Sequence, residues 1–71
     1  NDFSDCTAEE LAYYLTLSDG AYTENILHEL DLRWRDDPAG TDDAVAAYAQ
    51  AENGLASLWE NHKAANPDIF S

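Results

Sequence analysis

The sequence has almost no means of cross-linking itself. Among its 71 residues there is a single cysteine, Cys6, and there are only two histidines. One cysteine cannot form an internal disulfide, and a zinc site built from four Cys and His ligands would have too few members. We therefore expect no metal and no cofactor, a half-buried thiol at Cys6, and a protein of the reducing cytoplasm.

Basic residues are equally scarce. Arg33, Arg35 and Lys63 stand against 15 Asp and Glu, which gives a formal net charge of −12. This excess of negative charge repels a phosphate backbone, and anionic membrane surfaces attract basic segments instead. The chain also lacks a signal-peptide pattern and the run of about 18 apolar residues that a membrane span requires. We expect neither direct nucleic-acid binding nor a membrane role.

Apolar residues make up 45% of the chain and include eight aromatics. That content favours a folded protein over an acidic disordered one, although a domain of this size buries only about 60% of its unfolded surface. Apolar residues recur with helical spacing in three segments, and no strand pattern is present. The pattern predicts one all-α domain over residues 1–71, a small three-helix bundle with short loops.

The first predicted helix covers about residues 7–17. It opens with Thr7-Ala8-Glu9-Glu10, a capping box in which the side chains at both ends bond to each other's backbone amide. Leu11, Ala12 and Leu15 form its apolar face. Ser18-Asp19-Gly20 ends the helix, and Gly20 supplies a positive φ there.

The second predicted helix covers about residues 21–35. Its arginines, Arg33 and Arg35, complement the helix dipole at the C-terminal end, and Asp36-Asp37-Pro38-Ala39-Gly40 ends it. The apolar stripe of this helix consists of Ile26, Leu27, Leu30 and Trp34.

The third predicted helix covers about residues 41–65, with Thr41 as its cap. Asn53-Gly54 is a turn dipeptide in the middle of this pattern. The apolar face keeps its phase across the dipeptide, from Tyr48 to Leu55, so we favour one long helix over two short ones. After Asn66-Pro67, a tail containing Phe70 is expected to pack back onto the bundle.

Two motifs resemble metal sites, but in each of them residues that cannot bind a metal occupy ligand positions. His28-Glu29 opens like the HExxH helix of zinc proteases, but Leu32 replaces the second histidine. In the aspartate-rich segment around Gly40, a calcium-loop register would put Arg35 and Ala39 at ligand positions. No nucleophile elbow is present, and a small bundle offers little concave space, so we predict a non-enzyme.

Among the aromatics, Trp34, Tyr48 and Trp59 lie on core stripes. Tyr13, next to Leu17 on the other face of the first helix, is the candidate for an exposed interface residue inside an acidic rim. The alternative is that the tail containing Phe70 covers it.

Acids three or four positions apart on a helix lie about 5–6 Å apart, close to the spacing of successive phosphates. The sequence therefore favours an acidic inhibitor that occupies a basic, nucleic-acid-binding surface of a partner protein. In size and composition it resembles the small acidic inhibitors that phages and mobile elements direct against restriction or CRISPR systems, which act in the host cytoplasm. The candidate contacts are Asp36, Asp37, Asp42, Asp43, Glu52 and Glu60, with Glu9, Glu10 and Tyr13 as a second patch.

Two alternatives remain open. The acidity is also typical of a solubility or salt-adaptation coat, in which case an apolar patch would serve a homodimer or a larger assembly. An antitoxin-like or immunity-like partner of a cationic enzyme differs from the inhibitor only in its target.

Overall fold

The architecture is built entirely from helices in the parts of the chain that the structure, a computed structural model, describes: residues 3–17, 20–49 and 53–70. In chain order the elements are α1 (Ala8–Leu17), α2 (Thr23–Asp36), α3 (Pro38–Ala49), α4 (Asn53–Ala65) and the short α5 (Pro67–Phe70). None of these helices is long and apolar enough to cross a membrane. The all-α class is confirmed, but the prediction of three helices is wrong.

Helix α1 forms as its local sequence predicts. The Thr7 amide donates to Oε1 of Glu10 at 2.8 Å, and the Glu10 amide donates to Oγ1 of Thr7 at 3.1 Å. This capping box satisfies two amides that an α-helix leaves without partners. Gly20 has a φ of 109°, as the turn requires. The other two residues of the predicted stop signal, Ser18 and Asp19, lie outside the described residues.

The start of α3 differs from the prediction. Proline at position 38 is the first helical residue, where its missing amide hydrogen is not needed. Asp37 caps the helix, because its Oδ1 accepts from the Gly40 amide at 3.0 Å. A side chain at Gly40 would collide with this carboxylate. Thr41, the predicted cap, is instead a buried residue of the first turn, 2% exposed.

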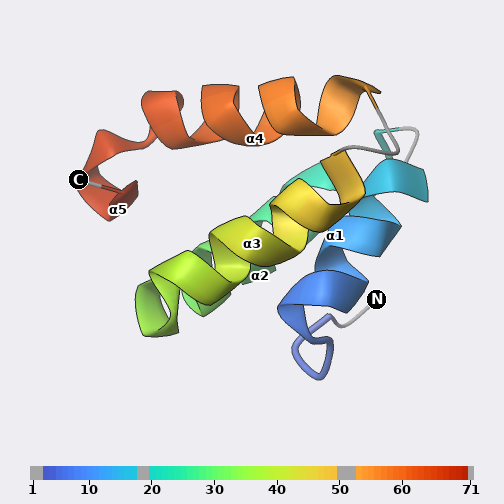
Figure 1. The fold of residues 1–71 in the computed structure, drawn as a ribbon, viewed down its shortest axis with the longest axis horizontal. Coiled ribbons are helices and arrows are strands. Elements are labelled where there is room, and N and C mark those ends of the chain that lie inside the picture. The colour runs from blue at the N-terminus through green and yellow to red at the C-terminus, as the bar shows by residue number, and fades with distance from the viewer. Residues whose placement is uncertain (1–2, 18–19, 50–52, 71) are drawn as a thin grey trace.

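The predicted long third helix is two helices. Helix α3 ends at Ala49 and α4 begins at Asn53, so Gly54 lies in the first turn of α4 and not in the middle of a helix. Figure 1 shows α4 running along one side of α1, α2 and α3, at an angle to α3. Because α3 and α4 both turn their apolar faces toward the same core, the helical spacing of apolar residues continues from one helix into the other. An unbroken phase therefore did not require an unbroken helix.

The core lies where α1, α2 and α3 meet beneath α4. Helix α1 contacts α2 and α3, and α3 also contacts α2 and α4. The Cα radius of gyration is 10.9 Å, which matches the roughly 11 Å of a compact chain of this length. Cys6 is half-buried and packs against this core, as predicted. The core side chains are Leu11, Ala12, Leu15, Ile26, Leu27, Leu30, Val45, Leu55 and Trp59.

Candidate partner-binding surfaces

Three of the predicted contact residues meet at one shallow hollow. Glu9 reaches it from the first turn of α1, and Asp36 and Asp37 reach it from the junction of α2 and α3. All three are exposed, and Arg33 lines the same hollow, which has a volume of about 320 Å³. The sequence placed Glu9 in a separate patch, but the packing of α1 against α2 and α3 joins the two patches. We call this feature the acidic hollow.

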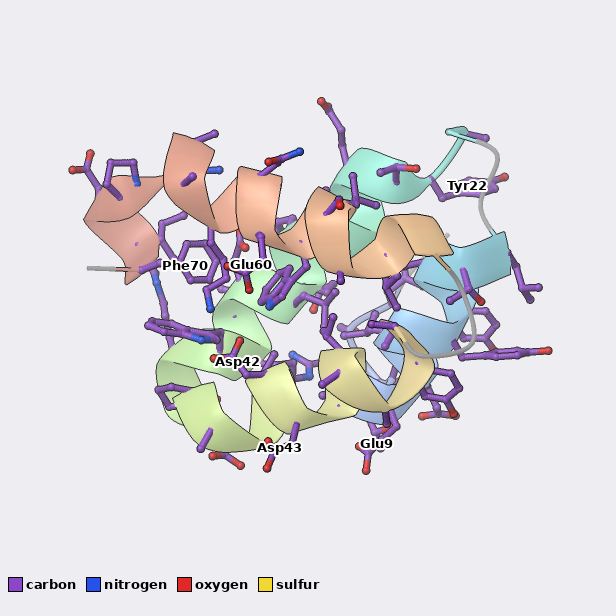
Figure 2. The ribbon with its side chains drawn as sticks, turned by 45° about the horizontal axis from the view of Figure 1, so that its top comes forward. Glu9, Tyr22, Asp42, Asp43, Glu60 and Phe70 are labelled. Carbon is purple, nitrogen blue, oxygen red and sulfur yellow. The ribbon has the colours of Figure 1, made fainter. Side chains whose placement is uncertain are left out.

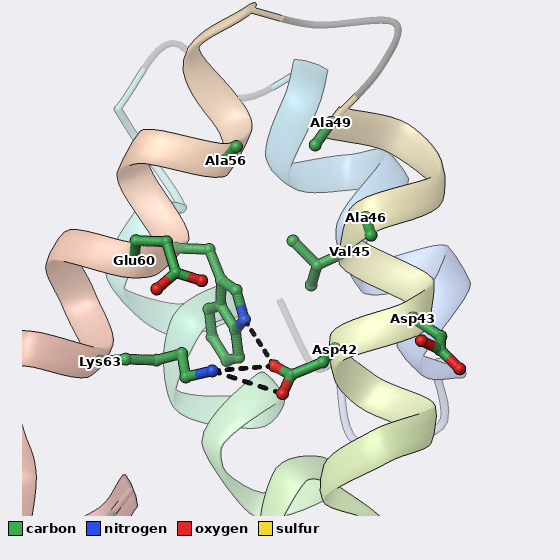
Figure 3. A pocket seen from close by; sticks show the side chains of 9 residues that line it. Asp42, Asp43, Val45, Ala46, Ala49, Ala56, Glu60 and Lys63 are labelled. Carbon is green, nitrogen blue, oxygen red and sulfur yellow. Dashed lines mark hydrogen bonds and ion pairs between the residues drawn. The ribbon is translucent and has the colours of Figure 1, made fainter.

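A second depression separates α3 from α4. It has a volume of about 450 Å³ and is lined by small side chains such as Ala46 and Ala56. Exposed carboxylates stand on both of its sides, Asp43 on α3 and Glu60 on α4 (Figure 3). Asp43 points outward from α3, on the same edge of the molecule as Glu9 (Figure 2).

Asp42, which is half-buried, bonds to other side chains of the protein. Its Oδ1 accepts from the indole N–H of Trp59 at 3.0 Å and from the Lys63 ammonium at 3.1 Å (Figure 3). Its Oδ2 accepts from Trp34 at 3.4 Å. Burial acts to raise the pKa of Asp42. The hydrogen bonds from Trp59, Lys63 and Trp34 and the charge of Lys63 outweigh it, so the pKa lies below its ordinary value. This carboxylate joins α2, α3 and α4.

Glu10 and Glu52 are the two remaining acidic residues among the predicted contacts. Glu10 is exposed, but one of its oxygens is held by the capping box of α1. Glu52 lies outside the described residues.

Two of the three cations neutralise internal groups. Arg33 donates to the backbone oxygens of Ser4 and Cys6, at 2.6 and 3.0 Å, and pairs with Glu29 at 3.4 Å, so it ties the N-terminal segment to α2. Lys63 pairs with Asp42. Within the described ranges no ion pair reaches Glu9, Asp36, Asp43 or Glu60. The sequence assigned Arg33 only to the helix dipole. It missed the bonds from Arg33 to Cys6 and Ser4, which lie 27 and 29 positions earlier in the chain, because no local pattern encodes such a contact.

All four tyrosines gather with Phe3 in one chain of rings, which we call the tyrosine ladder: Tyr22, Phe3, Tyr14, Tyr13 and Tyr48. Neighbouring ring centroids are 5.8 to 6.2 Å apart. Tyr13 is 46% exposed and Tyr14 40%, so the ladder lies at the surface, and Leu17 beside it is 62% exposed. Phe70 packs against Trp34 and Trp59 instead. Of the two alternatives that the sequence left open for Tyr13, exposure and coverage by the tail, the structure shows exposure.

The histidines do not form a metal site. His62 Nε2 lies 2.7 Å from Oδ1 of the buried Asp31, and its ring stacks on Trp59, so it closes the edge of the core. His28 is exposed on α2. Among the residues that the structure describes, no group of three or more His, Cys, Asp or Glu side chains is placed to hold a metal ion.

No protein-family model matches the chain, and comparisons with curated proteins and with solved structures found no match either. The functional argument therefore rests on the chemistry of these surfaces.

Proposed function

We propose that this protein is a non-enzymatic acidic binding protein that occupies a basic, nucleic-acid-binding surface of a partner protein. A small inhibitor of a restriction or CRISPR component is one protein of this kind. The contact surface consists of the acidic hollow with the neighbouring Asp43, and it extends to the acids beside the groove between α3 and α4.

One observation carries the proposal. The carboxylates that serve the fold have partners within the protein, Asp42 with Lys63 and Glu29 with Arg33, whereas Glu9, Asp36 and Asp43 face solvent with no cation paired to them in the described parts. Because all three belong to helices, their backbone is already ordered before binding. A cationic surface gains attraction and a faster encounter from such an arrangement.

The test begins with capture. The tagged protein is exposed to a lysate of its native cell at low salt, bound proteins are eluted with rising salt, and each captured protein is assayed for nucleic-acid binding with and without the acidic protein. We expect a salt-released, basic partner whose nucleic acid is displaced at stoichiometric amounts. A partner held equally at low and high salt, or one that keeps its nucleic acid, contradicts the proposal.

A matched pair of variants separates this surface from charge in general. Glu9→Gln with Asp36→Asn neutralises the acidic hollow, and Glu24→Gln with Asp68→Asn neutralises two exposed acids elsewhere; each changes the net charge from −12 to −10. We expect the first variant to weaken displacement about tenfold or more, because charge pairs at an interface contribute about 1.5 kcal/mol or more each. The second should act like the wild type.

A second function has its own support. Exposed acids also lie away from the hollow, at Glu24 on α2, Glu60 on α4 and Asp68 on α5, a spread that fits a salt-adaptation coat. The tyrosine ladder would then be an assembly interface between copies. Sedimentation equilibrium at low and at molar salt tests this reading, which requires a dimer at high salt that Tyr13→Ala dissociates.

A further inference from the structure

We propose that the tyrosine ladder is an arginine-binding surface, so that the partner presents arginine side chains rather than lysines to this face. The inference rests on the proposed function and narrows the chemistry of the partner. It is carried by the exposure of the ladder, by the carboxylates beside it and by the net charge of the chain.

The carboxylates stand one helical turn before the rings. On α1, Glu9 precedes Tyr13 by four residues, and Glu10 precedes Tyr14 by four. Residues at this spacing are neighbours about 5–6 Å apart on the helix surface, so each ring lies one turn from a glutamate. One oxygen of Glu10 accepts from the Thr7 amide, whereas Glu9 has no ion pair within the described residues. A cation lying on the ring meets the π face and a negative charge together. Both glutamates are exposed.

Tyr13, Tyr14 and Tyr22 are the exposed rings of the row, and the half-buried Phe3 and Tyr48 pack against the core. Phe3 joins Tyr14 to Tyr22 with centroid separations of 6.1 and 6.2 Å, and Tyr13 joins the row to Tyr48 at 6.0 Å. These five rings come from the N-terminal segment, α1, the start of α2 and α3, and the fold has brought them together. Tyr22, 45% exposed, ends the row on the side of the molecule opposite Phe70 (Figure 2).

The cations of the protein do not use this surface. Over the described residues, the cation–π contacts are those of Lys63, whose Nζ lies 5.9 Å from the ring centroids of Trp34 and Trp59. The ladder therefore offers aromatic faces and nearby carboxylates to a cation supplied from outside.

The net charge of the chain indicates which kind of ligand the tyrosine ladder binds. Nucleobases also stack on exposed aromatic side chains, but their phosphates would meet a chain of net charge −12. A second copy carries the same charge, so pairing two ladders brings Glu9 and Glu10 against their own equivalents. Arginine fits better than lysine because its planar guanidinium stacks on a ring while its N–H groups donate to a carboxylate.

The test compares two defined probes, labelled decaarginine and decalysine peptides, by fluorescence anisotropy with the full chain. Both carry the same charge, so attraction to the acids alone favours neither strongly. We expect decaarginine to bind about fivefold or more tightly than decalysine, since an exposed cation–π contact contributes a few-fold for each ring engaged.

Two double variants assign the preference to the rings. Tyr13→Leu with Tyr14→Leu keeps apolar bulk but removes the π faces, and we expect it to reduce the preference for arginine to about twofold or less. Tyr13→Phe with Tyr14→Phe keeps the faces, and we expect it to keep the preference. Helical circular dichroism and melting temperature establish that both variants remain folded.

The outcomes separate the two proposals. An equal affinity of the wild type for both peptides, or an arginine preference that survives the leucine variant, overturns the arginine-binding surface while leaving charge-led capture standing. If neither peptide binds, or if binding ignores Glu9→Gln with Asp36→Asn, the proposed function fails together with the inference. A wild-type dimer that the leucine variant dissociates also overturns it, in favour of a second copy.

Discussion

The two aromatic clusters of this protein are alike in size and differ in exposure. The tryptophan cluster of Trp34, Trp59, His62 and Phe70 comes from α2, α4 and α5, whereas the tyrosine ladder comes from the N-terminal segment, α1, the start of α2 and α3. Phe70 of the cluster and Tyr22 of the ladder lie on opposite sides of the molecule (Figure 2). Trp59 is 3% exposed, and its indole N–H and the nearby charge of Lys63 are both satisfied by Asp42. Three rings of the ladder are exposed, and no ion pair reaches Glu9 or Glu10 among the residues that the structure describes.

The difference teaches where each kind of aromatic residue acts. In the tryptophan cluster, an acid and a base are used up in holding three helices together, so substitutions there change stability. The ladder has rings and neighbouring carboxylates but no cation paired with them in the described parts of the chain, so we expect substitutions there to change binding. The predictions below test this division through the free energy of unfolding, from the largest expected effect to the smallest.

Trp59→Ala should have the largest effect. It removes a buried indole from the core and leaves Asp42 without its closest indole donor, and substitutions of this kind cost about 3–5 kcal/mol. A domain of this size has a total stability of only several kcal/mol, so a large fraction of the variant should be unfolded. Urea denaturation followed by circular dichroism measures the loss; a cost under about 1 kcal/mol would place Trp59 outside the core.

Asp42→Ala comes next, with an expected cost of about 1–3 kcal/mol, because the buried N–H of Trp59 loses its acceptor. Asp43→Ala is the matched control: it removes the neighbouring acid, which is exposed and carries no ion pair within the described residues, and should change stability by about 0.5 kcal/mol or less. Equal melting curves for the two variants would show that Asp42 does not link the helices.

The pH dependence of stability should show Asp42 directly. Its pKa is lowered in the folded protein, so its contribution is complete above the ordinary aspartate pKa of about 3.9 and is lost as the pH falls through the lowered value. Acidification also relieves repulsion among the other acids. The relevant quantity is therefore the difference in the free energy of unfolding between the wild type and Asp42→Asn at each pH. That difference should shrink below about pH 4; parallel profiles for the two proteins would contradict the shift.

Tyr13→Leu with Tyr14→Leu should have the smallest effect on stability, within about 0.5 kcal/mol, because both rings are largely at the surface. Thermal melting of this double variant and of Trp59→Ala under the same conditions compares the two losses of stability. A loss comparable to that of Trp59→Ala would mean that the ladder is part of the core and not a binding surface.

The sequence predicted the parts of this fold that depend on local chemistry. The capping box at Thr7 and Glu10, the positive φ at Gly20 and the buried stripe of α2 each follow from residues within one or two helical turns. The break between α3 and α4 could not be found in the same way, because two helices packed on one core can continue a single apolar phase. Thr41 was misplaced because Pro38 had been taken only as a stop signal, although proline also begins helices.

The candidate surfaces also combine features that local patterns indicate with features that depend on tertiary packing. The position of Tyr13 on α1 made it a candidate for an exposed residue, with coverage by the tail as the alternative. Its partners could not be identified in this way, because Phe3, Tyr22 and Tyr48 reach it from three other segments. The union of Glu9 with Asp36 at the acidic hollow likewise depends on how α1 packs against the junction of α2 and α3. Local patterns identified the residue types, and tertiary packing decided which of them act together.

Specific use of the acidity is the central claim, and melting in graded potassium chloride tests it most directly. At about 0.1 M salt, repulsion between charges more than about 10 Å apart is already screened. We predict a cooperative melting transition there, with only a modest rise in melting temperature up to molar salt. A protein that is unfolded at about 0.1 M and folds only in molar potassium chloride would contradict the account, because its carboxylates would then be a coat adapted to salt.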